Sequence, residues 1–148
     1  MPVGCTAGLY RCRVIYEEDI QGITFTPYLY KPIQTLKMVD IGTWDYSFKY
    51  ADRSFLTQLL AENPGVDEVI MTQNGYITDS TIANLAFYDG KDWFTPNTPL
   101  LKGTKRQQLL DKQMIEEREI KIEDLKNYEG VCLINTFRNL ELEKIIKI

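Results

Sequence analysis

The segment from residue 69 to residue 78 constrains the fold more than any other part of this sequence. Two β-rich runs, residues 69–72 and 76–78, flank the dipeptide Asn74-Gly75. Asn-Gly suits the two positive-φ positions of a type I′ turn, the turn that best joins two antiparallel strands. The segment therefore predicts a tight β-hairpin, around which the chain must build a sheet.

Strand patterns bounded by turn residues fill most of the remaining chain. Residues 9–16 alternate in polarity and predict a strand, and a turn at residues 19–22 leads to a second β-rich run at 23–30. Pro27 cannot donate to a strand ladder, so it belongs at an edge or a bulge. Further strands are expected at residues 35–41, 83–88, 93–94, 119–122 and 131–134, with a rigid loop at 95–99.

Two helices are expected between these strands. Asp52 can cap the first, in which Phe55, Leu56, Leu59 and Leu60 recur at helical spacing before Asn63-Pro64-Gly65 ends it. Gly103-Thr104 opens the second, whose apolar side carries Leu109, Leu110, Met114 and Ile115. The sum is a mixed α and β (α/β) domain with more strand than helix.

Length and charge limit the organisation and the partners. A chain of 148 residues has the size of one ordinary domain, and residues 32–34 are the expected boundary between a small piece, 1–33, and a main body, 34–148. The formal net charge of -4 disfavours nucleic acid as a partner. Neither a membrane-spanning run nor a leader pattern occurs in the sequence, so we expect a cytoplasmic location and no membrane partner.

The cysteine and histidine contents limit the chemistry. Cys5, Cys12 and Cys132 are widely spaced and form no CxxC motif, which indicates neither a disulfide framework nor a metal site. The chain contains 0 histidines, which excludes Ser-His-Asp and Cys-His nucleophile systems. An enzyme with this sequence must use lysine, tyrosine, carboxylates or a cofactor.

Several short motifs resemble, in order and spacing, those of one enzyme family. Residues 49–53 (KYADR) resemble the lysine segment K-x-x-N-R of fold type IV enzymes that use pyridoxal 5′-phosphate (PLP). Residues 67–71, 74–79 and 80–85 resemble the D-E-x-x-x, D-G-x-V-T-E and G-S-x-S-N-x-F motifs of the same family. Residues 95–96 and 103–106 resemble its T-P and G-I-T-R motifs, and Asn135-Thr136 falls where the last phosphate-binding loop lies. From about residue 35 to the C-terminus, the chain resembles the class IV aminotransferases.

The resemblance implies a catalytic role for Lys49 and a cofactor contact for Asp79. A lysine amine can form an imine with the cofactor aldehyde and afterwards move the α-proton of a substrate. A carboxylate at the position of Asp79 faces the ring nitrogen in the family, although the family residue is glutamate, which is one methylene longer. For Lys49, the alternative is an exposed lysine beside a helix. For Asp79, the alternative is a turn carboxylate that caps Ser80-Thr81. Asn84, by the same resemblance, orients this loop.

The remaining cofactor contacts implied by the resemblance concern the phosphate. Helix starts offer unpaired amides to an anion, and Gly103, Thr104 and Lys105 match the family residues at such a start. Asn135 and Thr136 match a second set of donors. Arg53 lies one helical turn after Lys49, where some members carry a basic residue near the phosphate. Its alternative is a surface arginine in an ion pair.

Arg13 is the expected substrate-binding residue. Arg11 and Arg13 share one face of the first predicted strand, and substrates of the family carry carboxylates that a guanidinium can grip. An exposed strand face is the alternative and is slightly favoured.

As a whole, the resemblance implies the large PLP-binding domain of the D-amino-acid aminotransferase-like fold, with residues 1–33 as a remnant of the small N-terminal α+β lobe. We expect a homodimer. The implied activity is transfer of an amino group from an amino acid to a 2-oxo acid. One alternative is 4-amino-4-deoxychorismate lyase, which releases pyruvate and 4-aminobenzoate, and another is a shortened, non-catalytic homologue. A small β-rich binding module is a third alternative, without a motif of its own.

Overall fold

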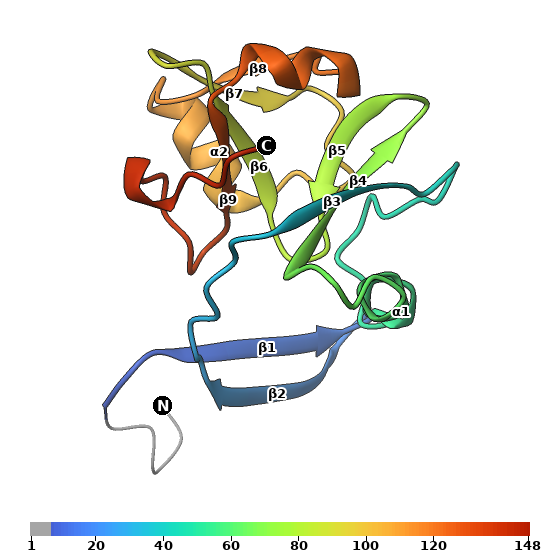
Figure 1. Ribbon diagram of the computed structural model, residues 1–148. Coiled ribbons are helices and arrows are strands. Elements are labelled where there is room, and N and C mark those ends of the chain that lie inside the picture. Colours follow the sequence, from blue (N-terminus) through green and yellow to red (C-terminus); the bar gives the residue numbers. More distant parts are fainter. Residues whose placement is uncertain (1–6) are drawn as a thin grey trace. The chain divides into compact units, whose positions relative to one another are not determined.

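The computed structural model describes residues 7–148, and the chain divides into two compact units, Met1–Pro32 and Ile33–Ile148. The described part of the first unit is an antiparallel hairpin of β1 (Tyr10–Tyr16) and β2 (Ile20–Pro27) (Figure 1). The turn expected around residues 19–22 lies slightly earlier, at residues 17–19, because Gly22 is already inside β2, where it pairs with Ile15 beside a register shift. β2 ends at Pro27, so residues 28–30 lie beyond the strand.

The first sheet of the second unit contains the predicted hairpin. Its order is β3-β4-β5, with β3 (Leu36–Asp40) parallel to β4 (Glu68–Gln73) and β4 antiparallel to β5 (Tyr76–Ser80). Asn74 has a φ of 52° and Gly75 a φ of 82°, as the Asn-Gly signature requires. The hairpin prediction is therefore confirmed.

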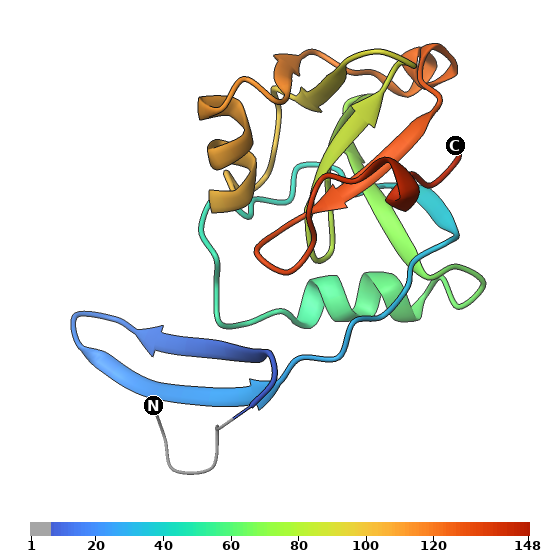
Figure 2. The same cartoon turned by 90° about the vertical axis from the view of Figure 1, so that its left-hand side faces the viewer.

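The second sheet has the order β8-β7-β6-β9. Its strands are β6 (Asn84–Tyr88), β7 (Trp93–Pro96), β8 (Glu116–Arg118) and β9 (Gly130–Ile134). β6 and β9 run side by side in opposite directions (Figure 2). The rigid loop expected at residues 95–99 begins later than predicted, because Thr95 and Pro96 still belong to β7. Pro96 is the last residue of the strand, where its missing N–H is tolerated.

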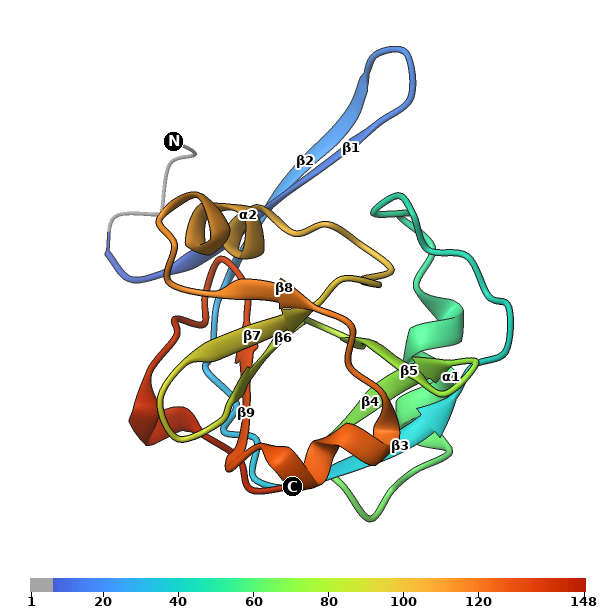
Figure 3. The same ribbon diagram turned by 90° about the horizontal axis from the view of Figure 1, so that it is seen from above.

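The central strands β4, β6 and β9 are buried on both faces, which explains their nearly continuous apolar sequences. Alternate residues of β4, β6 and β9 point into a core shared by the two sheets, including Ile70, Phe87 and Val131. The intervening residues face the helices: Val69 and Met71 pack against α1 (Ser54–Ala61), and Ala86 and Ile134 form a cluster with Leu109 of α2 (Thr104–Asp111). Viewed from above, the strands of the two sheets surround this shared core (Figure 3).

The helices start as expected but differ in their details. The Asp52 carboxylate accepts a hydrogen bond from the Ser54 amide at 2.8 Å, while Arg53 takes the cap position of α1. The second helix, α2, ends at Asp111, earlier than predicted, and Gln113 has a φ of 55° that turns the chain away. Met114 is consequently exposed, whereas Ile115 is buried outside the helix.

The strand expected at residues 119–122 is wrong. β8 lies at Glu116–Arg118, and a 3-10 helix, η1 (Ile122–Asn127), begins where the predicted strand would end. Ile120 is instead a buried core residue whose carbonyl accepts the Ile77 amide at 2.9 Å. Because only an isolated bridge, between Tyr76 and Lys121, follows this bond, no ladder forms there. A second 3-10 helix, η2 (Leu142–Lys144), follows β9.

The described residues confirm a mixed α and β fold. Within residues 7–148, no helix is long and apolar enough to cross a membrane, and no group of three or more Cys, Asp or Glu side chains could hold a metal ion. Cys12 is exposed and Cys132 buried, and both are free thiols. Cys5 lies outside the described residues.

Candidate active site

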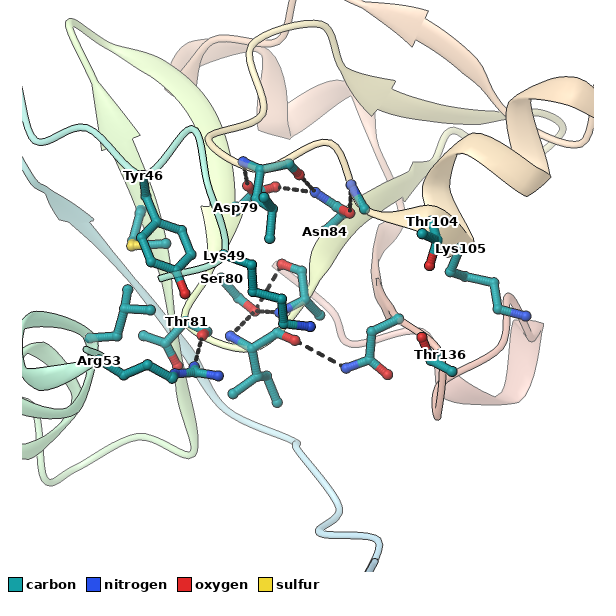
Figure 4. Close-up of a pocket in the computed structure, with 17 residues that line it drawn as sticks. Tyr46, Lys49, Arg53, Asp79, Ser80, Thr81, Asn84, Thr104, Lys105 and Thr136 are labelled. Carbon is teal, nitrogen blue, oxygen red and sulfur yellow. Dashed lines mark hydrogen bonds between the residues drawn. The ribbon is translucent and has the colours of Figure 1, made fainter. Parts of the chain in front are cut away.

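A cavity of about 110 Å³ in the second unit gathers residues that are far apart in the sequence. Four segments supply most of its lining: the loop between β3 and α1, the end of β5 with its turn into β6, the start of α2 with the loop before it, and the loop after β9 (Figure 4). Eight of the nine predicted site residues line this cavity: Lys49, Arg53, Asp79, Gly103, Thr104, Lys105, Asn135 and Thr136.

Arg13 is the predicted site residue that does not line the cavity. It lies on β1, in the first unit, where it pairs with Thr24 of β2. Arg11, on the same strand, places its guanidinium 5.5 Å from the ring centre of Tyr28. The role of Arg13 in substrate binding stays a prediction.

Lys49 lies on the loop between β3 and α1, and its side chain extends into the cavity (Figure 4). The residue is exposed, and within residues 7–148 its amine makes neither a hydrogen bond nor an ion pair. No carboxylate of the described chain therefore holds this amine, and a ligand in the cavity can reach it.

Asp79, at the end of β5, is the buried anion of the cavity, with 5% of its surface exposed. Its Oδ1 accepts a hydrogen bond from Asn84 Nδ2 at 2.7 Å, and its Oδ2 accepts one from the Leu101 amide at 2.9 Å. Burial raises the pKa of Asp79 to about 6, although both hydrogen bonds oppose the change. These partners differ from the Ser80-Thr81 cap that was the alternative for this carboxylate.

Asn84, the first residue of β6, joins Asp79 to the start of α2. Besides Asp79, its Nδ2 donates to the Leu101 carbonyl at 2.7 Å, and its Oδ1 accepts the Gly103 amide at 3.2 Å. A Cβ on Gly103 would collide with that same Oδ1, so a side chain at position 103 would displace Asn84. Asn84 thus orients the loop, as expected from the sequence.

The start of α2 is an open set of backbone donors. Gly103 is the cap residue, with no side-chain hydrogen bond to the first turn and no acidic residue in it. The side chain of Lys105 donates to Asn139 Oδ1 at 3.0 Å. Since the positive end of the helix has no side-chain cap, the amides of Thr104 and Lys105 can receive an anion.

The turn from residue 80 to residue 83 is fixed from three directions. Glu68 Oε1 accepts hydrogen bonds from the Thr81 amide at 3.2 Å and the Thr81 hydroxyl at 2.7 Å. Arg53 Nη2 donates to the Thr81 carbonyl at 2.6 Å, and Asn135 Nδ2 donates to the Ile82 carbonyl at 3.0 Å. Arg53 and Asn135 thus have structural partners as well as places on the cavity wall. Their contacts with a cofactor stay predictions.

Arg106, the last residue of the G-T-K-R segment, anchors α2 to the neighbouring strands β7 and β8. Its buried Nη2 donates to the Pro96 carbonyl at 2.9 Å and forms an ion pair with Glu117. The positive charge of Arg106 also slightly opposes the rise of the Asp79 pKa.

Sequence reasoning missed several residues of the cavity, of which Tyr46 has the most reactive side chain. Tyr46 lies three residues before Lys49 and is buried, and its hydroxyl points into the cavity (Figure 4). The aromatic-rich segment around Lys49 was the available signal. The other missed residues are Leu56, Met71, Ser80, Thr81, Ile82, Ala83 and Leu101.

Comparisons with known proteins agree with this arrangement. A sequence model of the family Amino-transferase class IV matches residues 25–140. The chain is 39% identical over 140 residues to an uncharacterized protein of Haemophilus influenzae, covering 95% of this chain and 74% of the relative.

Two further relatives carry a more specific description. A candidate aminodeoxychorismate lyase of Schizosaccharomyces pombe is 37% identical over 79 residues, which cover 50% of this chain and 34% of that protein. The crystal structure of a candidate 4-amino-4-deoxychorismate lyase from Haemophilus somnus is similar with a TM-score of 0.85 and 41% identity, covering 90% of this chain and 69% of that one. The family match and this likeness together show that the chain belongs to the class IV aminotransferase family.

Proposed function

We propose that this chain is a PLP-dependent enzyme whose reactive amine is Lys49. One observation carries the proposal: a single cavity brings together an amine that has no partner among residues 7–148, a buried carboxylate and a helix start without a side-chain cap. PLP presents an aldehyde, a ring nitrogen and a phosphate, which are the chemical complements of these three groups. The residues therefore fit the cofactor.

Each residue has a task that its surroundings support. Lys49 would hold the cofactor covalently and then move the proton at the α-carbon of the substrate. Asp79 would place negative charge beside the ring nitrogen, with Asn84 and Leu101 keeping the carboxylate in position. The amides of Thr104 and Lys105, with Thr136 and Arg53, would bind the phosphate. When bound, the cofactor supplies the electron-withdrawing ring that stabilises negative charge on the α-carbon.

For the specific reaction, we propose 4-amino-4-deoxychorismate lyase first and amino-acid aminotransferase second. The likeness at 41% identity to a protein of the first description favours the lyase, whereas the sequence motifs alone do not separate the two reactions. Both reactions begin with removal of the α-proton, so the role of Lys49 is the same. A homodimer, a cytoplasmic location and a substrate contact from Arg13 also belong to the proposal.

Reduction with borohydride tests the role of Lys49 directly. Protein mixed with PLP should gain an absorbance band at the edge of the visible range, and borohydride should fix the cofactor on Lys49. Lys49→Ala should abolish this adduct, while Lys102→Ala, an exposed lysine outside the cavity, should leave it unchanged. An adduct on Lys105, or an undiminished adduct in Lys49→Ala, would overturn the assignment.

Product analysis separates the two reactions and the non-catalytic alternative. With 4-amino-4-deoxychorismate, the lyase should release pyruvate and 4-aminobenzoate in equal amounts. Aminotransferase activity should instead convert an added 2-oxo acid to its amino acid, while an added amino-acid donor becomes its own 2-oxo acid. A chain that forms the Lys49 adduct but yields neither product would favour a binding role.

A further inference from the structure

The loop that carries Lys49 also carries a second polar group directed into the cavity. Tyr46 is 6% exposed, lines the cavity and turns its hydroxyl toward the space beside Lys49 and Thr81 (Figure 4). Within residues 7–148 this hydroxyl makes no hydrogen bond. A phenol that is buried at its ring and unpaired at its oxygen leaves a donor unused unless a ligand or water accepts from it.

Aromatic packing fixes the direction of this hydroxyl. The Tyr46 ring stacks on Trp44 with centroids 5.0 Å apart, and Trp44 stacks on Phe55 of α1 at 4.2 Å. Tyr50 meets the Tyr46 ring edge-on at 5.8 Å. Val69 and Met71 of β4 belong to the same buried cluster. A ring held on these sides has little freedom to rotate, so its hydroxyl is preorganised for an acceptor in the cavity.

We propose that Tyr46 is a further ligand-binding residue of this site, whose hydroxyl donates a hydrogen bond to an anionic oxygen of the molecule that reacts with Lys49. The inference rests on the proposed function. The neighbours of the hydroxyl favour an anion, because Lys49, Arg53 and Lys105 line the same cavity while Asp79 is its one carboxylate among the described residues. The acceptor oxygen belongs either to the cofactor ring or to a substrate carboxylate, which share this chemistry.

Removal of the hydroxyl alone tests the inference. Tyr46→Phe keeps the stacked ring, so the fold should be unaffected. Tyr50→Phe is the matched control, since Tyr50 lies on the same loop, contacts the same ring and does not line the cavity. PLP binding is followed by absorbance and by the fluorescence of Trp44, which stacks on Tyr46. Affinity of the PLP-loaded protein for pyruvate and for an amino acid is measured separately.

Two results support the inference and identify the acceptor. A roughly threefold to tenfold weaker binding of PLP in Tyr46→Phe, the scale of one hydrogen bond, would assign the acceptor to the cofactor. Unchanged PLP binding with a similar loss for pyruvate or amino acid would assign it to the substrate carboxylate. In both cases Tyr50→Phe should behave as wild type.

Two other results overturn it, and they differ from a failure of the proposed function. Equal affinities of Tyr46→Phe and wild type for PLP and for both substrates would refute the role of Tyr46 and leave the Lys49 assignment intact. Equal losses in Tyr46→Phe and Tyr50→Phe would show that the effect is not specific to the hydroxyl that faces the cavity. If the wild-type chain gained no PLP band at all, the proposed function would fail, and this inference with it.

Discussion

The carboxylate of Asp79 accepts a hydrogen bond from the side chain of Asn84 at 2.7 Å, and the same asparagine accepts the amide of Gly103 at the start of α2. The group expected at the cofactor ring and the helix start expected at the phosphate are therefore held by one side chain. A change at any of the three residues should alter both parts of the cavity.

The first prediction concerns the pH dependence of stability. The pKa of Asp79 is raised by burial from 3.8 to about 6, so the folded chain binds this proton more tightly than the unfolded chain. The resulting stabilisation is complete below pH 3.8 and is lost as the pH rises toward 6. Relative to Asp79→Asn, the free energy of unfolding of the wild type should fall by about 2–3 kcal/mol over this range.

Urea unfolding of both proteins at several pH values between about 3.5 and 7 measures this difference. Asp79→Asn also disturbs the bonds to Asn84 and Leu101, which lowers its stability at every pH, so the change with pH is the relevant quantity. Parallel pH profiles for the two proteins would show that Asp79 ionises in the fold as it does in solvent.

The second prediction concerns Gly103. Gly103→Ala places a Cβ against Asn84 Oδ1, so Asn84 must move away from Asp79 and Leu101. We expect a loss of about 1–3 kcal/mol in the free energy of unfolding together with weaker PLP binding. Gly65→Ala is the control, because nothing lies within 4 Å of its added Cβ and its effect should stay within about 0.5 kcal/mol. Equal stabilities of the two variants, measured in urea, would contradict the close approach of Asn84.

The third prediction separates two roles of Arg53. Its Nη2 donates to the Thr81 carbonyl at 2.6 Å, and the proposal assigns its charge to the cofactor phosphate as well. Arg53→Met should weaken PLP binding by about tenfold or more, the scale of one charged hydrogen bond. Binding of pyridoxal, which has no phosphate, should be weakened less.

Titrations of wild type and Arg53→Met with both compounds decide between the roles. Equal losses for PLP and pyridoxal would mean that Arg53 only supports the turn at Thr81. A larger loss for PLP alone would support the phosphate contact.

The fourth prediction concerns the β1–β2 hairpin. Tyr16 is 72% exposed and Ile20 63% exposed, and Val14 and Ile23 form an exposed cross-strand pair. An isolated two-stranded hairpin is marginally stable in water, and its apolar surface and open edges favour association. We expect the chain to sediment as a dimer or larger species.

Replacing the exposed pair tests this expectation. The double variant Val14→Lys, Ile23→Lys should shift the chain toward monomer in sedimentation velocity runs, whereas Met114→Lys, an exposed apolar position of the second unit, should not. A wild-type chain that sediments as a monomer at the highest soluble concentration would rule out the association.

The sequence alone determined the local features whose causes are local. Asn74-Gly75 specified its turn because these residues tolerate positive φ, and the turn in turn specified that β4 pairs with β5. The order and spacing of short motifs identified the family before any contact was known. The sequence-based prediction was wrong where one pattern is compatible with several structures. Residues 119–122 alternate in polarity like a strand, but Ile120 is a buried core residue and a 3-10 helix begins at Ile122.

The tertiary structure decided what depends on residues that are distant in the chain. Asp79 has a raised pKa because β5, the turn before β6 and the loop before α2 exclude water from it, which no local pattern records. Tyr46 belongs to the site because its ring stacks on Trp44, which itself stacks on Phe55, and this packing directs the hydroxyl into the cavity. Burial and convergence are properties of packed surfaces, so the residue types of the site could be read from the sequence, whereas their partners and protonation required the fold.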